Sequence, residues 1–351
     1  MTSEGEPVYH LAMREVHEAL GARFETALGW SLPADFGDVT AEHAAIRDGV
    51  ALLDRSPRSR FIISGTDAHE VLEAVVAGHV HELEEGRAMR SVVLDAEGRI
   101  RDVVLVARTG GISYILGGEP TQRFETLARM ERAVRPDFDA RIDDRTETTC
   151  LLGITGPQAS SFVQDQLSDA LPERLPSMHI STTEFHGFRT LVMRSSDTGE
   201  DGFEMMLAPA VMQHLLESLR GVGAGIAGYR AQEIARVEAC VPAFVPDLET
   251  GLTPAQADLD VLLDIPGGEE GVILSAMLLE LDEPPAPGTT VEGDGTYSGQ
   301  IRSAVRSPRL DATLALAVLD QRYALPGISL TVEGSGAAVV GKPFLRRSSG
   351  T

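Results

Sequence analysis

The chain has 351 residues and carries 53 acidic against 30 basic side chains, which gives a formal net charge of −23 at pH 7. A surface of this sign repels phosphate backbones and anionic lipids, so the composition argues against a nucleic-acid or membrane-surface partner. The chain is 43% hydrophobic and 24% charged, a balance typical of a globular protein long enough for more than one domain.

The N-terminal segment predicts an amphipathic helix from Val8 to Leu20, because its apolar residues recur at close to helical spacing. Acidic residues interrupt this stretch, so it does not resemble a secretory leader. No run in the chain approaches 18 apolar residues, and the two cysteines, Cys150 and Cys240, form no disulfide framework. We therefore expect a cytoplasmic protein.

The next pattern is a strand, a glycine and a helix. Arg60 to Gly65 is rich in β-forming residues, and Asp67 followed by Glu70 predicts a capping box that opens a helix from Ala68 to Val76. Two further strands are predicted, and they span Ser91–Leu94 and Val103–Ala107.

A second strand, glycine and helix unit begins near Cys150. Ile154, Gly156 and Ala159 stand at the same spacing as Ile63, Gly65 and Ala68. Three identities fit an internal duplication and also fit two unrelated units. Strands are predicted again at 188–193 and 203–207, so the mixture lacks strict alternation and indicates an α+β fold.

Helices are predicted at 208–219 and 229–239, and a glycine-rich run lies between them. This run, Gly223 to Gly228, matches G-x-G-x-x-G, but a helix rather than a strand precedes it, which argues against a dinucleotide site. From about Gly268 onward, prolines, glycines and short β-rich runs at 314–319 and 328–332 predict a small all-β domain.

Other motifs support no familiar chemistry. His79 and His81 alternate without a third ligand in register, so a metal site is not expected. The chain has no G-x-S-x-G elbow, P-loop or H-E-x-x-H motif, which leaves hydrolase and kinase functions without support.

Two carboxylates stand in unusual settings. Asp102 precedes a continuous apolar strand, where an unpaired carboxylate would be costly to bury, so it needs a partner or a ligand. Glu204 follows a turn rich in glycine and aspartate and lies between Phe203 and Met205. For each residue alone, a structural or solvent-facing role is the simpler interpretation.

Taken together, these segments resemble the aminomethyltransferase (glycine cleavage T-protein) family over nearly the whole chain. The segments that carry the resemblance are Ala27-Leu28-Gly29-Trp30, Leu53-Asp54-Arg55-Ser56, Gly65-Thr66-Asp67-Ala68, Glu97-Gly98-Arg99-Ile100-Arg101-Asp102, Gly156-Pro157, Thr198-Gly199-Glu200-Asp201-Gly202-Phe203-Glu204, Arg236-Val237-Glu238-Ala239, Ser307-Pro308-Arg309-Leu310 and Lys342-Pro343-Phe344. Their order and spacing are far more specific than any one of them.

The resemblance implies two discontinuous α+β domains and a C-terminal β-barrel around a central funnel that holds tetrahydrofolate. The folate-binding region would span residues 1–265 and the barrel 270–351. Asp102 would be the catalytic residue beside the folate nitrogens, and Glu204 would hold the pterin ring. Arg236 and Gln232 would complete the cofactor-binding set.

The chain also departs from the family pattern at four positions. Asp197 replaces a tyrosine, Gln232 an arginine, Arg90 an aromatic residue and Gly117 an asparagine. Three functions remain open: a transferase that moves a one-carbon group from a small methylated or aminomethylated donor to tetrahydrofolate, a non-catalytic folate-binding protein, and a glycine-cleavage component that docks a lipoyl carrier protein.

Overall fold

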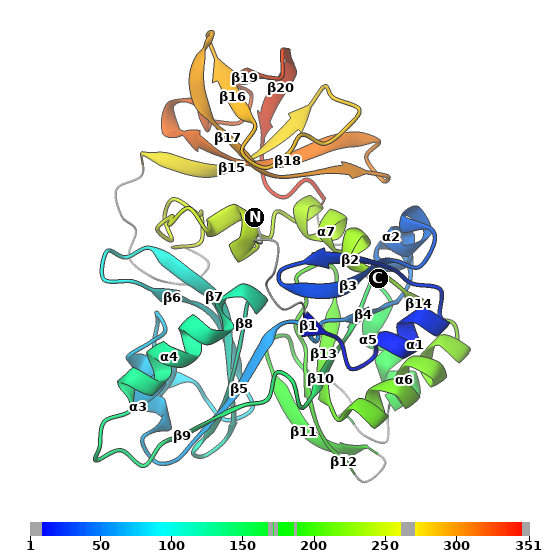
Figure 1. Cartoon of the computed structure of the whole chain (residues 1–351), viewed down its shortest axis with the longest axis vertical. Coiled ribbons are helices and arrows are strands. Elements are labelled where there is room, and N and C mark those ends of the chain that lie inside the picture. Colours follow the sequence, from blue (N-terminus) through cyan, green and yellow to red (C-terminus); the bar gives the residue numbers. More distant parts are fainter. Residues whose placement is uncertain (1–8, 168–170, 172–174, 186–187, 261–270, 346–351) are drawn as a thin grey trace.

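The computed structural model describes residues 9–167, 171, 175–185, 188–260 and 271–345. Two sheets with flanking helices lie side by side, and a closed barrel sits against one end of the pair (Figure 1). This is the α+β architecture with a C-terminal barrel that the sequence predicts. The expected domain boundary between residues 265 and 270 lies outside the described residues, as does Val8.

The first described elements differ from the predicted N-terminal helix. They are β1 (Tyr9–His10), α1 (Arg14–Ala19), β2 (Arg23–Ala27) and β3 (Trp30–Asp35). Tyr9 and His10 pair in parallel with Trp30 and Ser31, so pairing with a distant strand replaces local helical bonds. The helix prediction is therefore wrong for its first half.

The first large sheet has the order β6-β7-β8-β5-β9. Its strands are β5 (Ser59–Ser64), β6 (Ala88–Leu94), β7 (Ile100–Gly110), β8 (Ser113–Gly118) and β9 (Arg141–Asp144). Its helical segments are α3 (Ala68–Glu73), η1 (Val80–Glu82), η2 (Pro120–Gln122) and α4 (Arg123–Ala133). The three strands predicted in this region are confirmed, each somewhat longer or shifted by a residue.

The predicted capping box does not form at the start of α3. The side chain of Asp67 makes no capping hydrogen bond to its own helix. Its carboxylate instead accepts a hydrogen bond of 2.7 Å from the backbone N–H of Asp139, just before β9. A long-range partner has thus taken the acceptor that the local pattern assigned to the helix.

The second large sheet has the order β11-β12-β13-β10-β4-β14. Its strands are β4 (Ala51–Asp54), β10 (Cys150–Thr155), β11 (Ile180–Phe185), β12 (Phe188–Met193), β13 (Gly202–Leu207) and β14 (Gly225–Ile226). The helices of this half are α2 (Val39–Asp48), α5 (Ala159–Leu167), α6 (Pro209–Gly221), α7 (Tyr229–Glu238) and the helical turn η3 (Phe244–Leu248). Because β4 precedes the first sheet in the chain, the second domain is discontinuous, as predicted.

The two sheets share one topology. In the first sheet β6, β7 and β8 follow one another and then pair with β5, which precedes them in the chain. In the second sheet β11, β12 and β13 pair in the same way with β10. The one difference is that β4 is inserted between β10 and the last strand, β14. Equivalent glycines, Gly65 and Gly156, have φ of +123° and +138°. A Cβ at Gly65 would overlap the carbonyl oxygen of Asp139, and one at Gly156 that of Gly49. This agreement supports the duplication over chance similarity.

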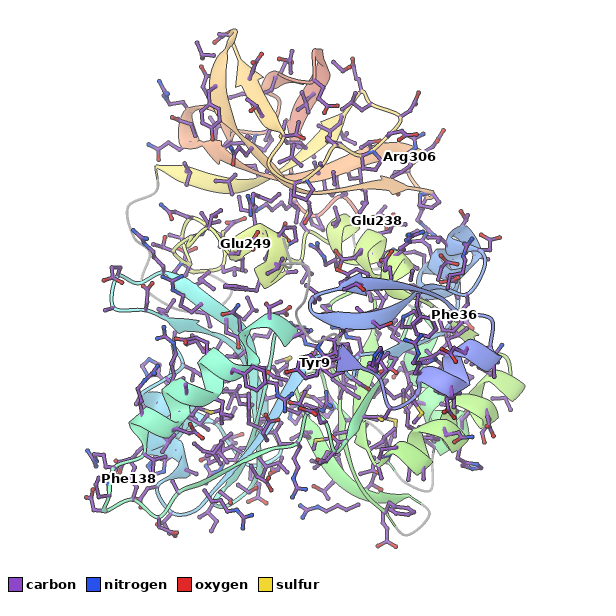
Figure 2. All side chains as sticks on the ribbon, in the orientation of Figure 1. Tyr9, Phe36, Phe138, Glu238, Glu249 and Arg306 are labelled. Atoms are coloured by element: carbon purple, nitrogen blue, oxygen red, sulfur yellow. The ribbon has the colours of Figure 1, made fainter. Side chains whose placement is uncertain are left out.

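The C-terminal barrel closes in the order β15-β18-β17-β16-β19-β20. Its elements are β15 (Val272–Leu279), β16 (Thr290–Gly293), β17 (Thr296–Ser307), β18 (Ala312–Asp320), η4 (Gln321–Tyr323), β19 (Ser329–Val332) and β20 (Ser335–Val340). Glu238, at the end of α7, lies below the barrel (Figure 2) and accepts a hydrogen bond of 2.5 Å from the Ser307 hydroxyl of β17. α7 therefore connects the barrel to the two sheets.

Candidate functional site

Two chambers lie where the two sheets and α7 meet. The outer chamber spans about 780 Å³ and the inner about 740 Å³, and both volumes include space that is open to solvent. The outer chamber is lined by Leu28, Leu32, Pro33, Asp54, Arg55, Pro57, Arg58, Glu119, Pro120, Asp197, Tyr229, Gln232, Glu233, Arg236, Val241, Pro242, Ala243 and Val245. The inner chamber is lined by Arg58, Ser59, Arg60, Arg90, Val103, Val104, Leu105, Ala107, Ile115, Gly117, Leu151, Ile180, Leu191, Met193, Ser195, Ser196, Asp197, Glu204 and Met206.

The inner chamber is a largely apolar slot between equivalent faces of the two sheets. Val103, Leu105 and Ala107 of β7 form one wall, and Leu191 and Met193 of β12 belong to the other. Strand alternation explains the first wall, because every second residue of β7 faces the same side.

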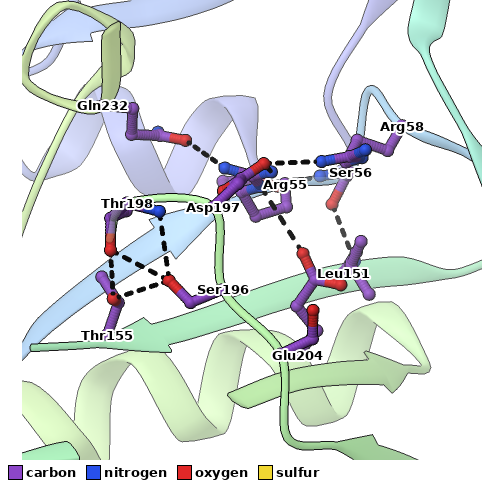
Figure 3. A network of polar contacts seen from close by, with 12 residues as sticks. Arg55, Ser56, Arg58, Leu151, Thr155, Ser196, Asp197, Thr198, Glu204 and Gln232 are labelled. Carbon is purple, nitrogen blue, oxygen red and sulfur yellow. Dashed lines mark hydrogen bonds and ion pairs between the residues drawn. The ribbon is translucent and has the colours of Figure 1, made fainter. Parts of the chain in front are cut away.

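Arg58 and Asp197 line both chambers and therefore mark the junction between them. The Asp197 Oδ2 atom accepts hydrogen bonds from Arg58 Nη1 at 2.7 Å and from Arg55 Nη2 (Figure 3). Arg58 also donates to Glu119 Oε1 at 3.1 Å. The junction is thus built from charged side chains.

The charges at the junction shift one another's protonation. Burial alone would raise the pKa of Asp197, but Arg55 and Arg58 hold it well below its usual range. For Glu119, burial dominates and raises the pKa despite the nearby Arg58. Arg58 itself has a raised pKa, because Glu119 and Asp197 outweigh its burial. The pair Arg58–Asp197 is therefore charged at neutral pH.

Glu204 lies in the inner chamber, as the predicted pterin contact requires. It stands on β13, opposite Gly153 of β10 and Met193 of β12. Its Oε1 atom is 3.8 Å from Arg55 Nε, and its side chain is 16% exposed. This separation leaves the carboxylate free to accept hydrogen bonds from a ligand.

Gln232 and Arg236 both line the outer chamber, but they differ in how many hydrogen-bonding groups they leave for a ligand. Gln232 Oε1 accepts from Arg55 Nη1 at 3.4 Å. All five N–H groups of Arg236 are already used: Glu233 takes two of them, and Asp247, Ser303 and the carbonyl of Val241 take the rest. In this structure Arg236 joins α7, η3 and β17 and has no N–H left for a ligand.

Asp102 lies behind the wall of the chambers and lines neither of them. It is completely buried, and its oxygens accept hydrogen bonds from the Glu119 backbone N–H at 3.0 Å and from the Thr126 hydroxyl at 2.7 Å. Burial raises its pKa to about 7, although both hydrogen bonds oppose the shift. The sequence argument that this carboxylate needs a partner is met by Thr126 and Glu119. A catalytic role stays a prediction.

Sequence reasoning did not single out Arg58 or Glu119 and gave Arg55 no role in the site. Arg55 and Arg58 lie in a short segment between β4 and β5, and Glu119 follows the end of β8. Two arginines around Pro57 in a connection between apolar strands are the signal that could have revealed them. Two departures from the family pattern, Arg90 and Gly117, line the inner chamber.

Other groups lie away from the chambers. His79, His81 and Glu82 bring three possible ligand atoms within 4.8 Å of one another, so the third ligand that the sequence lacked is present. All three side chains are exposed, and we assign no metal to them. Cys150 is buried and Cys240 half-buried, and both are free, as predicted. No helix among the described residues is long and apolar enough to cross a membrane.

Comparisons with known proteins agree with this architecture. An aminomethyltransferase of Saccharopolyspora erythraea is 30% identical over 96% of this chain and 98% of its own. One of Thermotoga maritima is 28% identical over 95% and 97%. The crystal structure of glycine cleavage system aminomethyltransferase T from Bartonella henselae superposes with a TM-score of 0.87 at 22% identity, and the match covers 96% of this chain and 98% of that one, which shows a shared fold.

The family models divide the chain into the same two parts as its architecture. The model of the GCVT N-terminal domain matches residues 13–266, which contain both chambers. The model of the glycine cleavage T-protein C-terminal barrel domain matches residues 275–345. With both domains present in order, this chain belongs to the glycine cleavage T-protein family of aminomethyltransferases.

Proposed function

We propose that the protein is an enzyme that transfers a one-carbon unit, as a methyl or aminomethyl group, from a small donor to tetrahydrofolate. The observation that carries this proposal is the inner chamber, which has apolar walls and the carboxylate of Glu204, held only loosely at 3.8 Å from Arg55. The other carboxylate of this chamber, Asp197, already accepts hydrogen bonds from Arg55 and Arg58. A pterin edge offers adjacent N–H donors, and a carboxylate pairs with two such donors at once.

The described residues of the inner chamber fit this ligand. The Ser59 hydroxyl is buried at the chamber wall and has no hydrogen-bond partner among the described residues. Arg90 has one donor, Nη2, in hydrogen bonds to Ser195 and Ser196, which leaves N–H groups for a ligand. A buried unpaired hydroxyl is costly unless a ligand satisfies it. Tetrahydrofolate supplies the nucleophilic nitrogens when bound.

The remaining residues bind and orient. Glu204 holds the heterocycle, and the walls of β7 and β12 exclude water around it. The outer chamber, which meets the inner one at Arg58 and Asp197, receives the donor. Asp102 enters the proposal as a positioning residue, because it holds the backbone of Glu119 at the chamber wall. We keep Gln232 as a contact to the ligand in the outer chamber.

A second candidate is the glycine-cleavage component itself. The curated relatives are named aminomethyltransferase, and the superposed protein belongs to a glycine cleavage system. In that case the donor would be held on a lipoyl carrier protein. Consumption of tetrahydrofolate with an aminomethylated lipoyl carrier, compared with free methylated amines, separates the two candidates. Binding of folate without turnover on any donor would support a non-catalytic folate-binding protein instead.

The binding prediction is tested by calorimetry with tetrahydrofolate on the wild type and on Glu204→Gln. Loss of one charge-assisted pair weakens binding by about one to two decades. Glu217→Gln is the control, because Glu217 is an exposed carboxylate of α6 outside both chambers. Equal affinity of the Glu204 variant and the wild type would remove Glu204 from the pterin contact.

A further inference from the structure

Asp197 holds an unusual position at the junction of the two chambers. Of the described residues, only Arg58 and Asp197 line both. The side chain of Asp197 is 19% exposed, whereas that of its partner Arg55 is 12% exposed. Since the carboxylate lines the chambers on both sides, what it leaves exposed faces the cavity. Any group that extends from one chamber into the other must pass it.

The two oxygens of Asp197 are used unequally. Oδ2 accepts from both Arg55 and Arg58, while Oδ1 has no hydrogen-bond partner among the described residues (Figure 3). One oxygen therefore bridges two guanidinium groups, and the other remains an acceptor. A carboxylate oxygen accepts hydrogen bonds and cannot donate them when ionised.

The segment that carries Asp197 is held firmly in place. The hydroxyls of Thr155, Ser196 and Thr198 form a triangle with sides of 2.8–3.1 Å that fastens both neighbours of Asp197 to the end of β10. Arg90 Nη2 donates to the Ser196 carbonyl at 2.8 Å. Because both flanking residues are anchored, the backbone at Asp197 cannot move away without breaking this network, and Arg55 and Arg58 hold its side chain.

The consequence concerns the charge of the ligand. Arg55 and Arg58 would attract a carboxylate from a donor, but Asp197 lies in contact with both of them and would repel a second anion at short range. A protonated amine meets the opposite conditions, because Oδ1 of Asp197 and the nearby carboxylate of Glu119 both attract it. Partial burial of these side chains reduces solvent screening and strengthens both effects.

We propose that Asp197 determines the charge specificity of the junction: it acts as an internal anion that excludes carboxylate groups and binds a protonated amine of the one-carbon donor through Oδ1. That the bound amine belongs to a one-carbon donor rests on the proposed function. The preference for a cation over an anion rests on the geometry of the junction. Substrates with an ammonium group near the reacting carbon are accepted there, and substrates with a carboxylate at that place are rejected.

The experiment uses the full chain, methylammonium and acetate as probes, and Asp197→Asn as the variant. Both probes are titrated at constant ionic strength, and binding is followed by NMR of ¹³C-methyl methionines. Met193 and Met206 line the inner chamber, and the buried Met277 of the barrel serves as internal reference. The wild type should bind methylammonium at least tenfold more tightly than acetate, and Asp197→Asn should reverse this order.

Asp144→Asn is the matched control. Asp144 pairs with Arg123 at 2.7 Å, and its side chain is 18% exposed, a fraction close to the 19% of Asp197. Unlike Asp197, it lines neither chamber. This variant should keep the wild-type preference. If Asp197→Asn fails to fold, Asp197→Ser replaces it, since serine keeps a small polar side chain without the charge.

Two results would overturn the proposal: equal binding of the two probes by the wild type, or an unchanged preference in the Asp197 variants. A separate titration with tetrahydrofolate keeps the outcomes apart. If folate fails to bind while the probes discriminate, the proposed function is wrong and the charge specificity stands. If folate binds and the probes do not discriminate, only the role of Asp197 is wrong.

Discussion

The buried carboxylate of Asp102 could be satisfied either by partners within the protein or by a ligand. The strand pattern required a partner for its carboxylate, and the structure supplies the Thr126 hydroxyl and the Glu119 backbone N–H. Asp102 lines neither chamber, whereas its neighbour Val103 lines the inner one. Contact between Asp102 and a ligand is therefore not required to explain its burial.

The raised pKa of Asp102 predicts a pH-dependent stability. The folded protein holds this proton more tightly than the unfolded chain, so the stabilising contribution is full below the unfolded pKa of 3.8 and is lost as the pH rises through about 7. Asp102→Asn mimics the neutral form. Between pH 5 and pH 8 the variant should gain about 2–3 kcal/mol in unfolding free energy relative to the wild type.

Urea unfolding at a series of pH values measures this difference, and turnover of the same variant measures catalysis. Parallel stability curves for the two proteins would mean that Asp102 is ionised in the folded state throughout. A fall in turnover by about 10²–10⁴-fold with the fold intact would support the catalytic role predicted from the sequence. Normal turnover would leave Asp102 as a structural residue.

At the scale of the element, the strand, glycine and helix units are the repeated feature. In both units the glycine follows the strand, has a positive φ and lies against a backbone carbonyl. The N–H of Gly65 donates to Ile112, and that of Gly156 donates to Asp201, at equivalent places in the two sheets. A side chain is excluded at Gly65 and Gly156 because another backbone segment passes close to each glycine, and not only because the chain turns there.

Gly156→Ala should destabilise the protein for two reasons. An L-residue at this φ costs about 1–2 kcal/mol, and the added Cβ overlaps the Gly49 carbonyl oxygen, which forces the backbone apart. Gly98→Ala is the control, because Gly98 has φ of +74° with nothing within 4 Å of an added Cβ. Thermal unfolding should show a clearly larger loss for Gly156→Ala. Equal losses would mean that strain alone, without the close contact, accounts for the effect.

At the scale of the whole molecule, α7 holds the three parts together. Arg236 near its end contacts Asp247 of η3 and Ser303 of β17, and Glu238 contacts Ser307 of β17. Glu238 also accepts from His43 and Arg47 of α2 at 2.8 Å each. The barrel is thus attached to the N-terminal part of the chain through buried polar groups as well as through apolar contacts.

Arg236→Met should lower the unfolding free energy by about 3–5 kcal/mol, because it leaves Asp247 buried without its cation. Arg230→Met, on the same helix, should cost less than about 1 kcal/mol, since Arg230 is 54% exposed and pairs with Glu25 at the surface. Guanidinium unfolding measures both. If instead Arg236→Met keeps its stability and loses affinity for tetrahydrofolate, the sequence prediction of a ligand-binding arginine is correct.

Local patterns in the sequence determined much of the architecture. The strands at 188–193 and 203–207, the helices of α6 and α7, and the all-β C-terminal part follow from periodicity and turn residues, which act over a few neighbours. The position of Glu204 is different, because the strand pattern alone favoured a solvent-facing carboxylate and only the resemblance to the family placed it beside a ligand.

Only the tertiary structure decided which charged residues meet. Asp197 and Arg55 are 142 positions apart, and Asp67 and Asp139 are 72 apart, so no local pattern indicates either pairing. Arg236 is predicted as a ligand contact, yet side chains from α7, η3 and β17 and the Val241 carbonyl use all its donors. Hydrogen bonds and ion pairs depend on distances of a few ångströms between distant segments, and these distances exist only once the sheets and the barrel have packed.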